Sequence, residues 1–333
     1  MYDVTLIPGD GIGPEVAAAA RQVVDATGVN INWHVEEAGA AQIEKFGTPL
    51  PDQVIDSIRS TGLALKGPVT TPIGCGFRSV NVALRKALDL YVNLRPAKNY
   101  PNIPSHFTDV DLVVVRENTE DLYAGVEHMV GKDAAESIKI FTREGCRRVL
   151  RFAFDYAKQN GRHKVTAVHK ANIMKCTDGM YLEEARKIAA EYPELEFQEM
   201  IVDAMCMNLV TNPEKYDVLV LPNLYGDIVS DLTAGLVGGL GVAPGANIGK
   251  DAAVFEAIHG SAPDIAGKDM ANPTAIILSS VMLLRHIGES AAADAIDRAL
   301  IAVYASGKYR TFDLGGSTGT RAFTEAVLAE LKK

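Results

Sequence analysis

The stretch Asn223-Leu224-Tyr225-Gly226-Asp227-Ile228-Val229-Ser230-Asp231 marks the place where a strand gives way to a helix. It follows the apolar run 216–221, which is typical of a buried strand, and a helical pattern opens at Gly226. Asp227 and Asp231 are four residues apart, so on a helix they share one face and repel each other. A divalent cation with oxygen ligands would offset this repulsion, whereas a solvated acidic first turn would suit the helix dipole. Taken alone, the stretch leaves both interpretations open.

Strands alternate with helices along the whole chain, which predicts an α/β fold with a largely parallel sheet. The expected strands are 2–7, 31–36, 61–66, 111–115, 164–169, 197–202 and one that begins at 216. The expected helices are 16–27, 51–60, one from 79, 142–159, 179–192, one from 226, 275–287, 291–305 and 320–331. Residues 125–139 are expected to be irregular. Because no long linker interrupts the chain, we expect two lobes that share one continuous mixed sheet.

The glycines near the N-terminus do not form a dinucleotide-binding fingerprint. After Gly9 and Gly11 the third glycine position of that motif is occupied by Pro14, which suits the first turn of a helix. The sequence therefore predicts a fold other than the Rossmann fold.

Composition limits the classes of function. The chain has 333 residues, 47% hydrophobic content and a net charge of −9, which argues against nucleic-acid binding. No apolar run approaches membrane-spanning length, and the N-terminus lacks the pattern of a signal peptide. We therefore expect no membrane association. The four cysteines have neither CxxC nor zinc spacing and are expected to be reduced thiols, so we expect a cytoplasmic location.

Three arginines occur at or near the ends of apolar runs: Arg85, Arg95 and Arg116. A single arginine of this kind is usually a surface ion pair, but arginine also binds carboxylates through two hydrogen bonds. With Ser79 and Asn81 nearby, the three arginines indicate a site for a small polycarboxylate.

Three further residues follow predicted strands, where active sites of open α/β sheets lie. Tyr123 follows the strand that leads to Arg116, Lys170 follows 164–169, and Asp203 follows 197–202. Packing, solvent exposure and helix capping are the ordinary explanations for these residues. Proton transfer by the tyrosine and the lysine is the functional alternative.

The chain resembles the β-decarboxylating dehydrogenase family, which includes isocitrate, isopropylmalate, homoisocitrate and tartrate dehydrogenases. The resemblance covers nearly the whole chain and is carried by the motifs 9–13, 94–96, 116–123, 169–172, 223–231 and 259–264. It implies a large lobe (1–98 and 240–333) and a small lobe (99–239) that carries the substrate, the metal and the interface of a homodimer.

The resemblance also implies roles for individual residues. Asp227 and Asp231, with Asp203 from the second subunit, are expected to bind Mg²⁺ or Mn²⁺. Tyr123 and Lys170, the latter also from the second subunit, are expected to transfer protons. The active site would then be shared between subunits.

The substrate is expected to contact Ser79, Asn81 and the three arginines, as well as Tyr123 and Lys170. Isopropylmalate enzymes place aliphatic side chains where this chain has Ser79 and Asn81, so the resemblance favours isocitrate, then homoisocitrate and then isopropylmalate. A non-catalytic regulatory subunit and an anion-binding module without turnover remain alternatives.

The cofactor is expected to be NAD. NADP-using relatives usually carry a lysine and a tyrosine where this chain has Asp264 and Ile265, and a carboxylate at that place would bind the free ribose hydroxyls. The residues implied for the cofactor are Thr71, Glu256, His259, Gly260, Ser261, Ala262, Pro263, Asp264, Ile265 and Asn272.

Overall fold

The computed structural model describes residues 1–70 and 79–333. The chain divides into two compact units, which are described separately. The first comprises Met1–Leu88, Asn99–Thr108 and Val237–Lys333, and the second comprises Asp89–Lys98 and Asp109–Leu236. Both chain ends therefore belong to the first unit.

Within the residues that the structure describes, the first unit contains five strands in the order β2-β1-β3-β12-β11. Neighbouring strands are parallel except for β12 and β11, which are antiparallel. The strands are β1 (Tyr2–Ile7), β2 (Ile31–Val35), β3 (Leu63–Lys66), β11 (Pro244–Ile248) and β12 (Ala253–Ala257). The helices of this unit are α1 (Gly13–Asp25), α2 (Ile43–Phe46), α3 (Asp52–Thr61), α4 (Val80–Ala87), α9 (Thr274–His286), α10 (Ser290–Ala305) and α11 (Thr320–Leu331).

The main sheet of the second unit has its strands in the order β4-β5-β10-β8-β9. All neighbours are parallel except β4 and β5. The strands are β4 (Val92–Lys98), β5 (Asp111–Glu117), β8 (Lys164–His169), β9 (Glu196–Ile201) and β10 (Val218–Leu221). The helices are α5 (Arg143–Gln159), α6 (Thr177–Ala189), α7 (Val202–Leu209) and α8 (Asn223–Leu236), and a hairpin is formed by β6 (Glu127–Val130) and β7 (Ala134–Ser137).

The centre of the second sheet is covered on both faces. Leu112, Val113, Val114 and Val115 of β5 are all fully buried, so side chains that alternate between the two faces are equally shielded from water. The amphipathic helix α5 packs on β5 and β10, and α8 packs on β5. This packing fixes the first turn of α8 against the end of β5.

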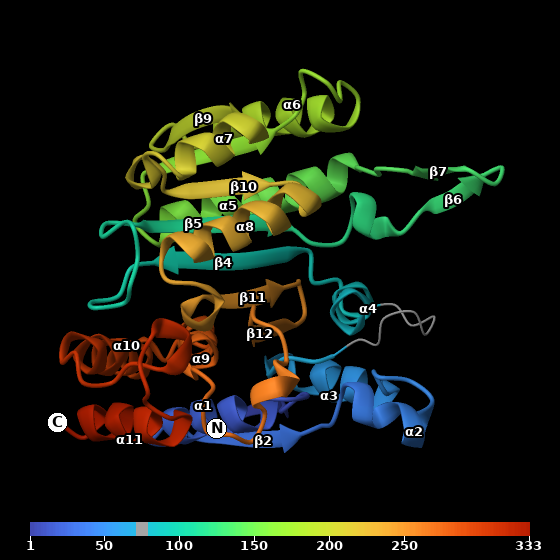
Figure 1. The fold of residues 1–333 in the computed structure, drawn as a ribbon. Coiled ribbons are helices and arrows are strands. Elements are labelled where there is room, and N and C mark those ends of the chain that lie inside the picture. The colour runs from blue at the N-terminus through green and yellow to red at the C-terminus, as the bar shows by residue number, and fades with distance from the viewer. Residues whose placement is uncertain (71–78) are drawn as a thin grey trace. The chain divides into compact units, whose positions relative to one another are not determined.

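The β6–β7 hairpin corrects the expectation that residues 125–139 are irregular. The two strands pair in antiparallel register around Gly131, whose φ of +70° suits a tight turn, and the hairpin projects away from the other elements of its unit (Figure 1). All eight strand residues are exposed. Without a buried face there is no hydrophobic alternation in the sequence from which these strands could be predicted.

The predicted fold class is confirmed as α/β with mixed parallel and antiparallel strands. The two compact units are divided differently from the expected lobes: residues 89–98 belong to the second unit, because β4 pairs with β5 along its whole length, and residues 99–108 and 237–239 belong to the first. The expected lobes and their roles stay a prediction. The α8 helix also begins at Asn223 rather than at Gly226. A sheet that continues from one lobe to the other stays a prediction. Among the described residues, no helix combines the length and apolarity that a bilayer crossing requires.

Candidate active site

The site in the second unit is built around the first turns of α8. Asp121 Oδ2 accepts a hydrogen bond from the Leu224 amide at 2.8 Å, so a side chain from outside the helix satisfies one of its free amides. Asp227 and Asp231 lie one turn apart on this helix, and their side chains are 37% and 57% exposed. Two carboxylates are thus presented on one partly open helix face, as the sequence predicted.

Arg116 lies at the end of β5 and is only 1% exposed. Its Nε and Nη2 donate to Asn223 Oδ1 at 2.9 and 2.7 Å, and its Nη1 donates to Asp227. A buried guanidinium needs such partners to offset the loss of hydration. Asn223 was not predicted as a site residue. Its position at the start of the helix that follows β10 could have indicated a site role.

Arg95 reaches the same helix from β4. It donates to Asn93 Oδ1 at 2.7 Å, Ser230 Oγ at 2.7 Å and Asp231 Oδ1 at 2.9 Å. The antiparallel pairing of β4 with β5 places Arg95 opposite Val114, close to the end of the strand that carries Arg116. Two of the three predicted arginines therefore meet the two predicted acidic residues.

Tyr123 completes this group from a short 3₁₀ turn, Leu122–Ala124. Its hydroxyl donates to Asp227 Oδ2 at 2.5 Å, and its ring centre lies 5.0 Å from the guanidinium carbon of Arg116. The structure thus brings together a candidate proton donor, two cations for carboxylate binding and two oxygen ligands.

Lys170 and Asp203 form an ion pair with each other. Lys170 follows β8, and Asp203 lies in the first turn of α7, which begins directly after the parallel neighbour β9. The hydrogen bond from Lys170 holds the pKa of the Asp203 carboxyl below its ordinary value. Their side chains are 25% and 68% exposed, so both groups are accessible from outside the chain.

In the first unit, Arg85 joins a buried group around Glu256. Lys66 Nζ lies 2.6 Å and Arg85 Nη2 lies 3.6 Å from the Glu256 carboxylate, and Asn247 donates to it at 2.7 Å. Burial alone would raise the pKa of Glu256, but Lys66 and Arg85 outweigh burial and lower it to about 2. Lys66 was not predicted, although it ends a strand as Arg116 does.

Ser79 is exposed and immediately precedes α4, and the partly buried Asn81 lies in its first turn. The Oδ1 atom of Asn81 is shielded from water and has no hydrogen-bond partner among the described residues. The predicted contact of Ser79 and Asn81 with the substrate stays a prediction.

The predicted cofactor segment runs from His259 to Ile265 and leads to Asn272. Ser261 Oγ lies 2.6 Å from Thr70 Oγ1, and its carbonyl oxygen accepts the Ile12 amide at 2.9 Å. Ala262 has a φ of +37°, and Asp264 is exposed. Asn272 is buried and donates to Asp313 Oδ2 at 3.1 Å. Thr71 lies outside the described residues.

His259 is well placed to accept a hydrogen bond. Burial lowers its pKa, which favours a neutral ring, and its Nδ1 lies 3.0 Å from the Gly260 carbonyl oxygen. Donation from Nδ1 leaves Nε2 as the acceptor. The described part of the chain offers no partner to this shielded Nε2, so the segment fits a ligand that carries a hydrogen-bond donor.

The family can now be assigned. A model of the isocitrate/isopropylmalate dehydrogenase family matches residues 3–327. The chain belongs to this family. The match confirms the predicted membership of the β-decarboxylating dehydrogenase family. It also confirms the prediction that the chain is an enzyme of this family.

Relatives within the isocitrate/isopropylmalate dehydrogenase family are similar over almost the whole chain. Isocitrate dehydrogenase (NAD) catalytic subunit 5, mitochondrial, of Arabidopsis thaliana is 51% identical over 98% of this chain and 88% of its own length. A mitochondrial regulatory subunit of isocitrate dehydrogenase (NAD) from Dictyostelium discoideum is 47% identical over 98% of this chain and 91% of its own length. The crystal structure of isocitrate dehydrogenase from Methylococcus capsulatus has a TM-score of 0.97 and 55% identity, and it covers 100% of both chains.

These relatives correct the expected location. The cytoplasmic location that we expected is contradicted, because similar family members from Arabidopsis thaliana, Drosophila melanogaster, Macaca fascicularis and Homo sapiens are named as mitochondrial proteins. The pattern of cysteines indicates whether a compartment is reducing or oxidising. It does not indicate which reducing compartment holds the protein.

The acidic residues of this family member fit a hard divalent cation. Asp227 and Asp231 offer carboxylate oxygens on one accessible helix face, which are the ligands that Mg²⁺ and Mn²⁺ prefer. Within the described part of a single chain, no three His, Cys, Asp or Glu side chains converge on a metal position. The predicted triad therefore needs Asp203 from a second copy and stays a prediction.

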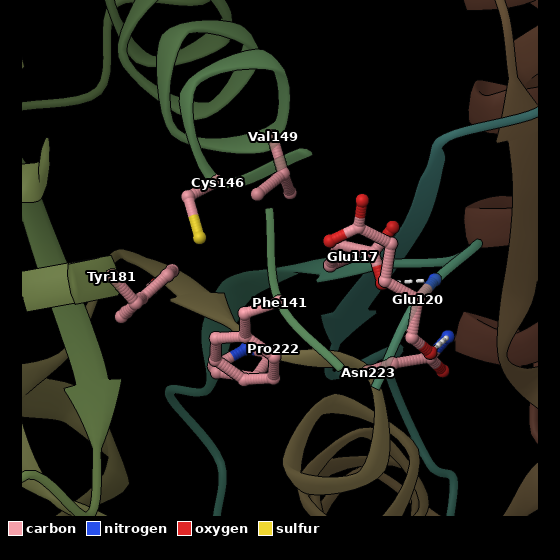
Figure 2. A pocket seen from close by; sticks show the side chains of 8 residues that line it. All are labelled: Glu117, Glu120, Phe141, Cys146, Val149, Tyr181, Pro222 and Asn223. Carbon is pink, nitrogen blue, oxygen red and sulfur yellow. Dashed lines mark hydrogen bonds between the residues drawn. The ribbon is translucent and has the colours of Figure 1, made fainter. Parts of the chain in front are cut away.

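A small cavity in the second unit is lined in part by Asn223, the partner of Arg116. It is lined by Glu117, Glu120, Phe141, Cys146, Val149, Tyr181, Pro222 and Asn223 (Figure 2). Burial raises the pKa of the Cys146 thiol to about 12, so this cysteine is inert near neutral pH. Cys146, Cys176 and Cys206 form no disulfide in the structure, and Cys75 lies outside the described residues. The reduced state stays a prediction.

Proposed function

We propose that this family member catalyses the metal-dependent oxidative decarboxylation of isocitrate to 2-oxoglutarate with NAD. The observation that carries the proposal is the convergence of Arg95, Arg116 and Tyr123 on Asp227 in the second unit. Relatives with about half of their residues identical are named NAD isocitrate dehydrogenase subunits, and they support the same substrate and cofactor.

The residues divide the work of the reaction between them. Arg95 and Arg116 would bind and orient substrate carboxylates, because a guanidinium stays charged and carries five N–H donors. Asp227 and Asp231 would hold the cation on the face of α8. When bound, the cation would supply Lewis acidity at the substrate oxygens and NAD would accept the hydride.

Proton transfer falls to two residues. Lys170, provided by a second copy of the chain, would take the proton of the substrate hydroxyl. Tyr123 would return a proton to the carbon that loses CO₂, and its hydrogen bond to Asp227 already fixes the hydroxyl beside the acidic residues. A positioned acid or base of this kind contributes roughly 10²–10⁴-fold to the rate.

The choice of isocitrate rests on the start of α4. Ser79 and Asn81 are short and polar, and the Ser79 hydroxyl and the Asn81 Nδ2 group can both donate hydrogen bonds to a substrate carboxylate. An aliphatic substituent at this place would leave these polar groups unpaired, which is costly. Homoisocitrate is the second candidate, because its longer arm ends in the same carboxylate, and 3-isopropylmalate is the third.

The choice of NAD rests on Asp264 and Ile265. Asp264 is exposed in the turn Pro263–Ile265, where a carboxylate can accept hydrogen bonds from ribose hydroxyls. The 2′-phosphate of NADP would remove one donor and add like charge, which we expect to reduce kcat/KM on the order of a hundredfold. The double variant Asp264→Lys/Ile265→Tyr should shift preference towards NADP.

A regulatory role is the alternative from another class, because a relative named as a regulatory subunit is 47% identical. Such subunits usually lose a group needed for proton transfer or metal binding. This chain retains Tyr123, Lys170, Asp203, Asp227 and Asp231, which favours catalysis.

One assay separates these possibilities. The purified chain is supplied in parallel with isocitrate, homoisocitrate or 3-isopropylmalate, each with NAD or NADP, and with Mg²⁺, Mn²⁺ or excess chelator. We expect the highest kcat/KM with isocitrate, NAD and a divalent cation, and loss of activity with chelator. Higher kcat/KM with another substrate would refute the substrate assignment. Absence of turnover with all three substrates would favour the regulatory alternative.

A further inference from the structure

We propose that Asp178 is a positioning residue for Lys170, and that Lys139 holds Asp178 in place. The inference rests on the proposed proton-transfer role of Lys170. Asp178 was not predicted as a site residue, and its contacts connect the main chain of Lys170 with a lysine at the base of the β6–β7 hairpin.

The carboxylate of Asp178 is fully buried. Its Oδ1 accepts the main-chain amide of Lys170 at 2.8 Å, while Oδ2 accepts Lys139 Nζ at 2.9 Å and Thr177 Oγ1 at 3.1 Å. A buried carboxylate persists only where charge or hydrogen bonds offset the lost hydration. One oxygen of Asp178 therefore binds the main chain of Lys170, and the other binds the ammonium group of Lys139.

Capping of its own helix would be the ordinary role for an acid in the first turn of α6. The residue at the N-cap position is Cys176, and within the described chain its side chain caps no amide. The two shortest hydrogen bonds of Asp178 instead reach Lys170 and Lys139, which lie outside α6. Asp178 therefore acts mainly on the neighbouring turn rather than on the helix that carries it.

Lys139 is enclosed on several sides. Its side chain is 14% exposed, and its Nζ lies 4.3 Å from the ring centre of Tyr225 and 4.6 Å from that of Phe141. A second buried carboxylate, Asp121, is 3.9 Å from the same Nζ. Aromatic faces and carboxylates both stabilise a desolvated ammonium group, so Lys139 is a fixed cation against which Asp178 is oriented.

The turn that presents Lys170 is tied down in several other places. The Lys170 carbonyl oxygen accepts the amides of Ile173 and Met174, both at 2.9 Å, and the Ala171 amide donates to His169 Nδ1 at 3.1 Å. The Lys170 amide itself donates to Asp178. Loss of this acceptor would free the main chain at the residue whose side chain must reach the substrate.

The test compares Asp178→Asn, Lys139→Met and the double variant with wild type. The control is Glu183→Gln, which also replaces a carboxylate by an amide on α6 but at an exposed position. We expect kcat to fall about 10–100-fold in each single variant, with KM for isocitrate within about threefold of wild type. The amide introduced by Asp178→Asn has only one acceptor oxygen, which the Lys139 ammonium and the Lys170 amide would both require. The double variant should recover part of the loss, because removal of the ammonium leaves that oxygen to the Lys170 amide. Lys139→Arg should retain more activity than Lys139→Met.

Amide hydrogen exchange at Lys170 gives a readout that does not depend on turnover. Exchange should accelerate at least about tenfold in Asp178→Ala and remain unchanged in Glu183→Gln. Unchanged exchange, or a wild-type kcat in both single variants, would overturn the positioning role, and so would a loss of kcat explained entirely by a smaller folded fraction. Wild-type protein without activity on isocitrate would instead refute the proposed function, and the exchange result would still stand.

Discussion

Replacing Gly226 by alanine should disrupt the active site through a single methyl group. Gly226 lies in the first turn of α8, immediately before Asp227. An added Cβ would lie 2.5 Å from Arg116 Cγ and 2.6 Å from Arg116 Cβ, with Arg116 Cα at 3.2 Å. Arg116 cannot move aside easily, because it is 1% exposed and is held by Asn223.

The magnitude follows from that geometry. Relief of the closest contact from 2.5 Å to the 3.4 Å of ordinary contact needs a displacement of roughly 0.9 Å between α8 and β5. Alanine would gain up to about 1 kcal/mol of helix propensity over glycine, whereas overpacking of this kind costs ~1–3 kcal/mol. With the full gain in propensity, we therefore expect a net destabilisation of up to ~2 kcal/mol. A misplacement of about 1 Å at Asp227 should lower kcat/KM on the order of a hundredfold.

Urea unfolding and steady-state kinetics with isocitrate, NAD and Mg²⁺ would measure both effects. The matched control is Gly235→Ala on the same helix, where a Cβ would meet no atom of the described residues within 4 Å. The control should be as stable as wild type or slightly more stable, and fully active. If Gly226→Ala kept wild-type stability and kcat/KM within twofold, the close packing of α8 on Arg116 would not be required.

Three further changes test other parts of the site. Asp227→Asn keeps the size of the side chain but removes an anionic ligand, so calorimetry should show much weaker Mg²⁺ binding; unchanged affinity would remove Asp227 from the metal site. Lys170→Met and Tyr123→Phe should each be inactive, and verified mixed dimers should regain part of the activity; no recovery would argue against a site shared between subunits. Burial opposes the ionised form of Glu256, but two neighbouring cations lower its pKa from 4.5 to about 2. Its stabilising contribution is therefore complete above pH ~4.5 and is lost as the pH falls towards 2. The unfolding free energy of Glu256→Gln should accordingly vary less between about pH 5 and pH 3 than that of wild type, and an identical pH dependence would contradict this ion cluster.

The parts of the site that could be predicted from sequence are those fixed by local pattern. Asp227 and Asp231 share a helix face because of their spacing, and Arg116 ends an apolar strand. Such relations depend on helix and strand geometry alone, and the structure reproduces them. Family motifs extended the prediction to Tyr123, which the structure places against Asp227.

The residues that were missed depend on pairings between distant segments. Asn223 receives two hydrogen bonds from Arg116, 107 positions away in sequence, and Lys66 meets Glu256 only because β3 and β12 are neighbours. The hydrophobic periodicity of a short stretch cannot predict either of these two pairs. The compact units are divided differently from the expected lobes for the same reason, since β4 pairs with β5, and the segment 99–108 between them belongs to the first unit.

The strand order also determines which unit can complete its strand pairing first during synthesis. The strands of the second unit are all present once residue 236 has left the ribosome, because its last segment is 109–236. The first unit must wait, since β12 pairs with β3 and is separated from it by the whole second unit in sequence. Until then the nascent chain carries an unpaired β3 edge, which is a template for incorrect association. Truncation between 237 and 252 would therefore release a chain with a complete second unit and an aggregation-prone first one.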